Sequence, residues 1–237
     1  MNYRNKKALV IFSRVPELSR RTPEEPYAGL PWTDLDALYS AMFDDVLETA
    51  ISLAGVDVFI LRNEQEFSNE FLSRINAQVQ VLELQSTSLN EQVRFAFETL
   101  FSKHYEHIVL LLDPNPLMTK QDLLSTFELL HYDDDCVVVG QNNDGKLYLL
   151  ALKSNHAEIF ESSGDAEIFS NQQLLEHVCD RELMVFPMPS KYTLDTGTNL
   201  QRLKLELEEL AGGNGFSHHT RTMFRAIDKK YKTRRFR

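Results

Sequence analysis

The sequence predicts an α/β fold with three layers (α/β/α), in which helices cover both faces of a mostly parallel, mixed sheet. Short all-apolar runs, typical of strands buried on both faces, alternate with longer segments whose apolar residues recur at helical spacing. This alternation implies right-handed crossovers and therefore parallel strands. The runs at 137–140 and 147–152 are joined by a turn too short for a crossover, so we expect one local antiparallel or splayed strand.

The first half of the chain contains clear strand and helix signals. Strands are predicted at the apolar runs 7–13, 56–61, 79–84 and 107–112. Helices are predicted between them at 34–54, 66–76 and 88–102. Thr33 is expected to cap the first of these helices, and Ser88 with Glu91 forms a capping box for the last.

The second half continues the alternation. Capping boxes formed by Thr119 with Asp122 and by Ser170 with Gln173 each open a helix. The other elements are strands at 137–140, 147–152 and 183–187 and a helix at 195–210. Glycines between 212 and 215 stop that helix, so we predict a main domain at 1–211 and a basic C-terminal appendage at 212–237.

The composition is that of an ordinary globular protein, with 237 residues, 43% hydrophobic and 25% charged. The apolar run near the N-terminus is too short for a signal peptide, and no stretch approaches the ~20 apolar residues needed for a membrane span. With only two cysteines, neither a disulfide framework nor a Cys-based zinc site is indicated. We therefore expect a cytoplasmic protein with no membrane span.

Charge is distributed unevenly along the chain. Residues 225–237 contain seven basic residues and one acid, a net of +6, which leaves −16 on the rest of a chain whose net charge is −10. Such a tail could bind nucleic acid, fold back on the acidic body, or contact a protein partner or a second subunit of a homo-oligomer. Nucleic acid is disfavoured, because the acidic body would repel a polyanion.

Asp113 is the first candidate for a chemical role. It directly follows the all-apolar run 108–112, and the carboxyl ends of buried strands are where open α/β sheets hold ligands. Asn115, two residues on, offers a second oxygen ligand. This pair could bind a hard divalent cation, which would in turn neutralise the phosphate charge of a bound cofactor. The alternative is that Asp113 makes a local turn next to prolines.

Three further motifs accompany Asp113. The loop Phe12-Ser13-Arg14-Val15-Pro16-Glu17-Leu18-Ser19-Arg20-Arg21-Thr22-Pro23 carries Arg14, Arg20 and Arg21, whose guanidinium groups could pair with phosphates or could simply be solvated. Asp144-Gly145-Lys146-Leu147-Tyr148-Leu149 is also explained by a hairpin turn without a ligand. Leu194-Asp195-Thr196-Gly197-Thr198-Asn199-Leu200 places Asp195 before a helix, where it would be an N-cap.

In this order the motifs resemble those of bacterial glycosyltransferase-A-like proteins, the nucleotide-diphospho-sugar transferase-like family of the radical-SAM-associated type, related to 2-phospholactate guanylyltransferase. The resemblance covers roughly Lys7 to Leu210 and implies the nucleotide-diphospho-sugar transferase fold. It implies that Asp113 and Asp195 hold Mg²⁺ or Mn²⁺ and that the arginines of the first loop steady donor phosphates. Asp144 then faces the acceptor.

The chain departs from the family pattern in each motif. Leu18 or Ser19 replaces a glycine in the first loop, and an extra residue after Asp113 disturbs the register of the second motif. Lys146 replaces the second glycine of the hairpin motif, and Gly197 and Asn199 replace a proline and an acid in the last. The predicted function is a metal-dependent glycosyl or nucleotidyl transfer from a nucleotide or nucleotide-sugar donor. The alternative is a catalytically degenerate relative that acts as a binding or assembly protein.

Overall fold

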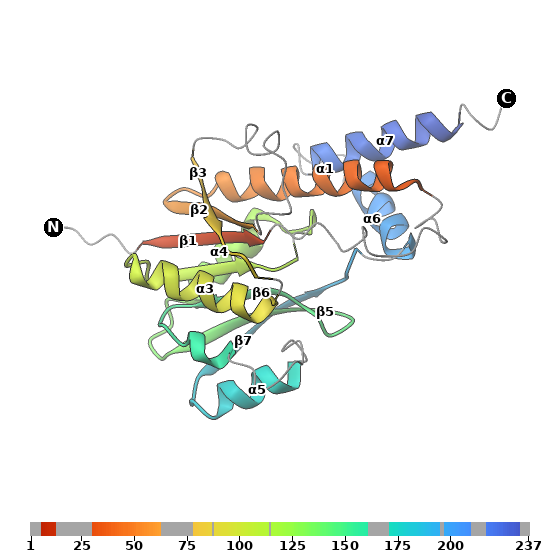
Figure 1. Cartoon of the computed structure of the whole chain (residues 1–237). Coiled ribbons are helices and arrows are strands. Elements are labelled where there is room, and N and C mark those ends of the chain that lie inside the picture. Colours follow the sequence, from red (N-terminus) through yellow and green to blue (C-terminus); the bar gives the residue numbers. More distant parts are fainter. Residues whose placement is uncertain are drawn as a thin grey trace.

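A mixed seven-stranded sheet forms the middle layer of the protein (Figure 1). Its strands are β1 (Lys7–Phe12), β2 (Val56–Arg62), β3 (Val79–Glu83), β4 (His107–Leu111), β5 (Cys136–Asn142), β6 (Leu147–Leu152) and β7 (Met184–Lys191). They lie in the order β3-β2-β1-β4-β6-β5-β7. The computed structural model describes residues 6–12, 30–62, 78–86, 88–113, 115–160, 171–194, 197–209 and 217–232.

Strand direction follows the prediction of a mostly parallel sheet. β1 pairs in parallel with β2 and β4, β2 with β3, and β5 with β7. β6 is antiparallel to both of its neighbours, β4 and β5, because the turn at 143–146 reverses the chain directly after β5. One antiparallel strand inside a parallel sheet makes it mixed, as expected.

Helices cover both faces of the sheet, which confirms the three-layer prediction. One face packs against α3 (Leu89–Ser102), α5 (Asn171–Cys179) and the short 3₁₀ helix η3 (Ala157–Phe160). The other face packs against α1 (Trp32–Ile51) and α4 (Lys120–Leu129). The buried residues of β1 alternate between the two cores, with Val10 in the first and Leu9 and Ile11 in the second. Both faces of the central strands are therefore buried, which explains their uninterrupted apolar sequences.

A third apolar cluster joins α1 to the two C-terminal helices, α6 (Gly197–Glu209) and α7 (His218–Lys232). α7 runs along α1 in Figure 1 and buries Phe224 and Ile227 in this cluster. Lys230 Nζ lies 2.6 Å from Asp34 Oδ1, and the Tyr231 hydroxyl donates to Asp34 Oδ2 at 2.6 Å. The described part of the basic tail thus folds back on acidic α1.

The sequence did not predict α7 as a helix, since its basic residues dominated the interpretation of that segment. The division of the chain at residue 211 stays a prediction, as does a contact of the tail with a partner subunit. In the segments that the structure describes, no helix is both long and apolar enough to cross a membrane.

Helix starts differ from the prediction in two places. α1 begins one residue before Thr33, with Pro31 at the N-cap and no side-chain cap, so the assignment of Thr33 as cap was wrong. The backbone carbonyl of Pro31 accepts the first amide bonds of the helix in its place. Ser88 caps α3 by accepting from the Glu91 N–H, but the Glu91 carboxylate contacts the Ser86 hydroxyl, so only half of that capping box forms.

The other start and strand signals agree more closely with the structure. The Thr119 and Asp122 box is complete at the start of α4, with bonds of 3.0 and 2.9 Å. The strand predicted at 147–152 has exactly the bounds of β6. The helix predicted at 66–76 and the Ser170 cap lie outside the described residues.

Gly140 allows the β5–β6 pair to close on a buried aromatic ring, and this close approach predicts a large effect on stability. A β-carbon at position 140 would lie 2.5 Å from Cζ of Tyr148 and 2.9 Å from Cβ of Leu149. Gly140→Ala should therefore displace the Tyr148 ring and lower the free energy of unfolding by about 2–3 kcal/mol in urea denaturation. Gly55→Ala is the control. Gly55 has a positive φ, +75°, but a β-carbon added there would meet no atom within 4 Å, so this variant should lose only about 1 kcal/mol of the free energy of unfolding. Equal losses for the two variants would contradict the packing argument.

His107 at the start of β4 predicts an acid-sensitive component of stability. His107 is buried, and the centroid of its ring lies 4.5 Å from that of the His131 ring. Burial, together with the electrostatic effects of His131 and Lys7, lowers the pKa of His107 to about 4. The unfolded chain, with a pKa of about 6.5, takes up this proton first, so stability is fully present above pH 6.5 and is lost as the pH falls toward 4.

We expect this linkage to remove about 2 kcal/mol of the free energy of unfolding between pH 7 and pH 4.5. Urea denaturation of the natural protein and of His107→Gln across this pH range measures it, since the carboxylates titrate alike in both proteins. The variant should show the flatter profile; parallel profiles would show that His107 does not titrate in this way.

Candidate active site

The carboxyl ends of the parallel strands meet at one edge of the sheet, and the strand order reverses there between β1 and β4. Such a reversal is where open α/β sheets bind ligands. Asp113 follows β4 at this point, as the sequence predicted, and β1 ends beside it because Ile11 pairs with Leu111. This edge is the candidate active site.

Asp113 is half-buried and held from two sides. Its backbone N–H donates to the Tyr148 carbonyl at 3.4 Å, next to the shorter bond of 2.9 Å from Leu112. Its carboxylate Oδ2 accepts a hydrogen bond of 3.2 Å from Nδ2 of Asn142, the last residue of β5. β6 separates β4 from β5, so this side-chain contact spans the beginning of β6.

Asn142 was not among the residues that the sequence singled out. It is 3% exposed, and its Oδ1 is buried without a hydrogen-bond partner among the described residues. The sequence does contain a signal, since Asn142 ends an apolar strand just as Asp113 does. The acid in the same turn, Asp144, is the more conspicuous candidate by residue type.

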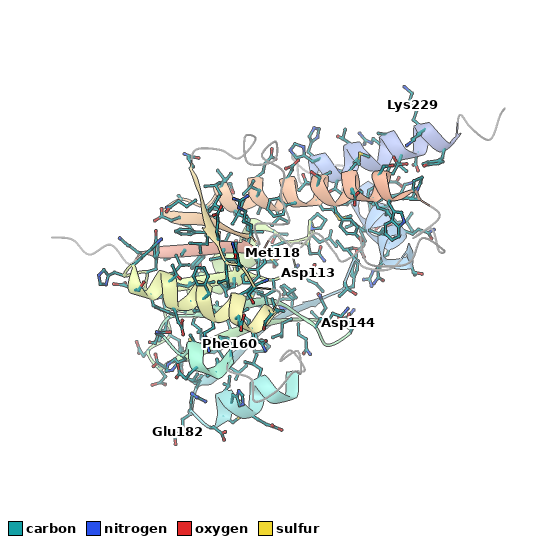
Figure 2. The ribbon with its side chains drawn as sticks, viewed as in Figure 1. Asp113, Met118, Asp144, Phe160, Glu182 and Lys229 are labelled. Carbon is teal, nitrogen blue, oxygen red and sulfur yellow. The ribbon has the colours of Figure 1, made fainter. Side chains whose placement is uncertain are left out.

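Asp144 lies on the outer turn of the β5–β6 hairpin, as Figure 2 shows. It is exposed, its Oδ1 accepts the Lys146 N–H at 3.2 Å, and its Oδ2 lies 3.4 Å from Lys146 Nζ. These contacts are the ones expected of a hairpin turn. No described contact joins Asp144 to Asp113.

Asn115 is 1% exposed, and both ends of its amide bind backbone groups. Oδ1 accepts from Leu117 N at 2.9 Å, and Nδ2 donates to the Tyr192 carbonyl at 3.0 Å. The side chain therefore ties the loop after β4 to the residue after β7. This arrangement fixes the frame around Asp113.

The remaining predicted site residues are Asp195, Arg14, Arg20 and Arg21, and all four lie outside the described residues. Asp195 falls between Leu194, whose carbonyl accepts from the Tyr39 hydroxyl at 2.5 Å, and the start of α6 at Gly197. The pairing of Asp195 with Asp113 thus stays a prediction.

Lys191, at the end of β7, is a basic residue beside the candidate site, where it pairs with Asn142 in the register of β5 and β7, and the sequence did not predict its role. Its side chain is 13% exposed, with Nζ 3.2 Å from Asp122 Oδ2 and 3.3 Å from the Leu117 carbonyl. Because Asp122 balances its charge, Lys191 joins β7 to the start of α4. Burial and, to a lesser extent, the nearby Asp122 charge raise the pKa of the Tyr148 phenol, which keeps it a neutral donor to the Pro189 carbonyl at 2.8 Å.

A second group of side chains could hold a metal ion by distance alone. Ligand atoms of Asp45, Glu48 and His219 lie within 4.8 Å of one another between α1 and α7. The two Asp45 oxygens, however, accept the backbone N–H groups of His219 and Thr220 at 2.9 and 2.8 Å. His219 Nε2 lies 2.8 Å from the Glu48 carboxylate, and the hydrogen bond that it donates there raises the pKa of His219. Asp45 on α1 therefore caps the N-terminus of α7.

The cap predicts that Asp45 holds α7 on the body. Asp45→Ala leaves two amides of the first turn unpaired and should lower the free energy of unfolding by about 2 kcal/mol. Glu48→Ala, which removes an exposed acid from the same cluster, should cost less than about 1 kcal/mol. Urea denaturation without divalent cations measures both; a larger loss for Glu48→Ala would contradict the cap.

Residues 46–164 match the protein family described as "Uncharacterized protein conserved in bacteria (DUF2064)". The chain belongs to this family. The matched region includes α3, α4, β2 to β6 and four residues of the candidate site, Asp113, Asn115, Asn142 and Asp144. No curated protein sequence matches the chain.

Solved structures show the same fold at low identity. A protein from Desulfovibrio desulfuricans G20 assigned as a nucleotide-diphospho-sugar transferase has a TM-score of 0.76 and 18% identity, over 95% of this chain and 96% of that one. The 4-diphosphocytidyl-2C-methyl-D-erythritol synthase of Anaerococcus prevotii DSM 20548 gives 0.56 and 13%, over 86% and 100%. A Rv0371c homologue from Mycobacterium sp. strain JC1 gives 0.54 and 16%, over 87% and 99%. The chain therefore has the nucleotide-diphospho-sugar transferase-like fold implied by its motifs.

Proposed function

We propose that this protein transfers a glycosyl or nucleotidyl group from a nucleotide-activated donor, with a divalent cation at Asp113. One observation carries the proposal: the Asp113 carboxylate, at the switch point of the sheet, accepts a hydrogen bond from the Asn142 amide, whose oxygen is buried and has no partner among the described residues. The fold shared with transferase-like proteins supports the same reaction class.

The residues present suit a hard cation. Mg²⁺ and Mn²⁺ prefer carboxylate and carbonyl oxygens, which are the groups that Asp113 and Asn142 offer. When bound, such a cation neutralises charge on the donor phosphates. On a chain of net charge −10, a bare carboxylate at this edge would instead repel the donor.

Other roles in the proposal come from the sequence. Arg14, Arg20 and Arg21 grip the donor phosphates, and Asp195 is a second carboxylate for the cation. The sequence offered Asn115 as a further oxygen ligand for the cation and the cofactor; in the structure its Oδ1 accepts from the Leu117 N–H, and we give it the role of holding the loop that carries Asp113. Asp144 faces the acceptor. Catalysis then consists of positioning and of stabilising charge on the leaving phosphate, which are the main contributions in phosphate-transfer enzymes.

A binding or assembly protein without catalysis is the second candidate. The exposed hairpin turn favours it, because Lys146 takes the place of a glycine and pairs with Asp144 at 3.4 Å. An acceptor must displace that ion pair before Asp144 can contact it. Donor binding without turnover is what this candidate predicts.

Thermal denaturation with a panel of nucleotides and nucleotide sugars, each with and without Mn²⁺, tests the proposal. The natural protein should melt about 5–10 °C higher with the cognate ligand at about 100 times Kd, and only when Mn²⁺ is present. Asp113→Ala should lose this shift, because the cation and the phosphates lose their shared anchor. Asp36→Ala, which changes an exposed acid on α1, is the matched control and should retain it.

Turnover separates the two candidate functions. A metal-dependent shift together with product formation supports the transferase, and the same shift without product favours the binding protein. A flat response across the panel, or an undiminished shift in Asp113→Ala, would overturn the proposed site.

A further inference from the structure

The backbone of Asn142 is fully used by the hairpin. Its N–H donates to the Lys146 carbonyl at 2.7 Å, and its carbonyl accepts from Gly145 N at 3.0 Å. These bonds set the end of β5 whatever side chain is present. The side chain therefore needs a separate explanation.

The side-chain amide does not serve the turn. Nδ2 reaches Asp113, 29 residues earlier in the chain, while Oδ1 is buried and has no hydrogen-bond partner in the described part of the protein. Exchanging the two amide atoms would bring Oδ1 against the Asp113 carboxylate, where two acceptors repel. The orientation with Nδ2 toward Asp113 is thus the favourable one.

A buried oxygen without a partner costs free energy that a ligand at this point recovers. The same amide lies beside the carboxylate to which the proposed function assigns the cation. An amide oxygen is a common ligand of hard cations, and being neutral it avoids the repulsion of a second carboxylate next to Asp113.

We propose that Asn142 is a ligand of the divalent cation at Asp113, with Oδ1 as the coordinating atom, and that its Nδ2 holds the Asp113 carboxylate in the binding orientation. This inference rests on the proposed function. It adds a ligand from β5 that the family-like motifs do not contain. A buried water at Oδ1, or a hydroxyl of the nucleotide, is the competing explanation.

Binding of Mn²⁺ alone, followed by the loss of its free-ion electron paramagnetic resonance signal, tests the inference without nucleotide or turnover. Asn142→Ala should weaken Mn²⁺ binding at least about tenfold. Asn142→Asp keeps an oxygen and adds a charge, so it should bind Mn²⁺ at least as tightly as the natural protein. Asn143→Ala is the matched control, since Asn143 is the exposed next residue and its Oδ1 accepts a hydrogen bond of 2.9 Å from the Ser190 hydroxyl, away from Asp113.

Melting temperature supplies a second readout that a purely structural residue would not change in this pattern. Without metal, Asn142→Asp should melt below the natural protein, because two carboxylates face each other, and Mn²⁺ should raise its melting temperature by more than it raises that of the natural protein. Asn142→Ala should show a smaller Mn²⁺ shift than Asn143→Ala.

The outcomes separate this inference from the proposed function. If Asp113→Ala loses Mn²⁺ and Asn142→Ala binds it normally, Asn142 is not a ligand and the proposed function stands. If Asn142→Ala binds Mn²⁺ normally but loses nucleotide, Oδ1 contacts the nucleotide and the inference is wrong. Failure of Mn²⁺ to protect Asn142→Asp also overturns it, and failure of the natural protein to bind Mn²⁺ overturns both.

Discussion

Tyr148, on β6, connects the end of β4 to β5 and β7 at the candidate site. Its carbonyl accepts from the N–H groups of Leu112 and Asp113 directly after β4, its ring fills the space left by Gly140 on β5, and its hydroxyl donates to the Pro189 carbonyl on β7. These contacts fix β6 as the antiparallel strand between β4 and β5. Because β6 lies there, the side chain at the end of β5 can reach the carboxylate at the end of β4.

The hydrogen-bond partners of the acidic side chains distinguish those that hold the C-terminal helix from Asp113. Asp34 and Asp45 on α1 bind Lys230, Tyr231 and the first amides of α7, so they fasten the C-terminal helix. Ser217, just before α7, also donates to the Pro116 carbonyl at 2.6 Å. The C-terminal helix is therefore tied to the loop that follows Asp113, although the two segments are about a hundred residues apart. Asp113 instead accepts a hydrogen bond from the Asn142 amide, whose Oδ1 is buried and has no hydrogen-bond partner among the described residues, and it is this difference that the proposed cation site rests on.

The sequence predicted what depends on local pattern. The apolar runs predicted the strands, and the Thr119 and Asp122 capping box predicted the start of α4. The position of Asp113 after a buried strand made it the first candidate for the site. Asn142 escaped because its contact with Asp113 depends on where β6 inserts, and no local pattern encodes that placement. The helix α7 was not predicted for a different reason. Thr220, Phe224 and Ile227 have helical spacing and are buried, but the many basic residues around them favoured the interpretation of this segment as a charged tail. Asp144 was noticed because it is an acid, whereas its contacts are those of a turn.

Departures from the family-like motifs are unequal in their physical effect. At the hairpin, Lys146 adds an exposed ammonium group whose partner is Asp144, so the change alters the charge of the outer turn. The contact between Asp113 and Asn142 lies at the base of the same hairpin and uses neither residue. Loss of the glycine therefore leaves the proposed donor side intact and changes the acceptor side. The hairpin turn and the contact between Asp113 and Asn142 are thus separate parts of the same edge of the sheet, and a substitution in the turn changes the first without removing the second.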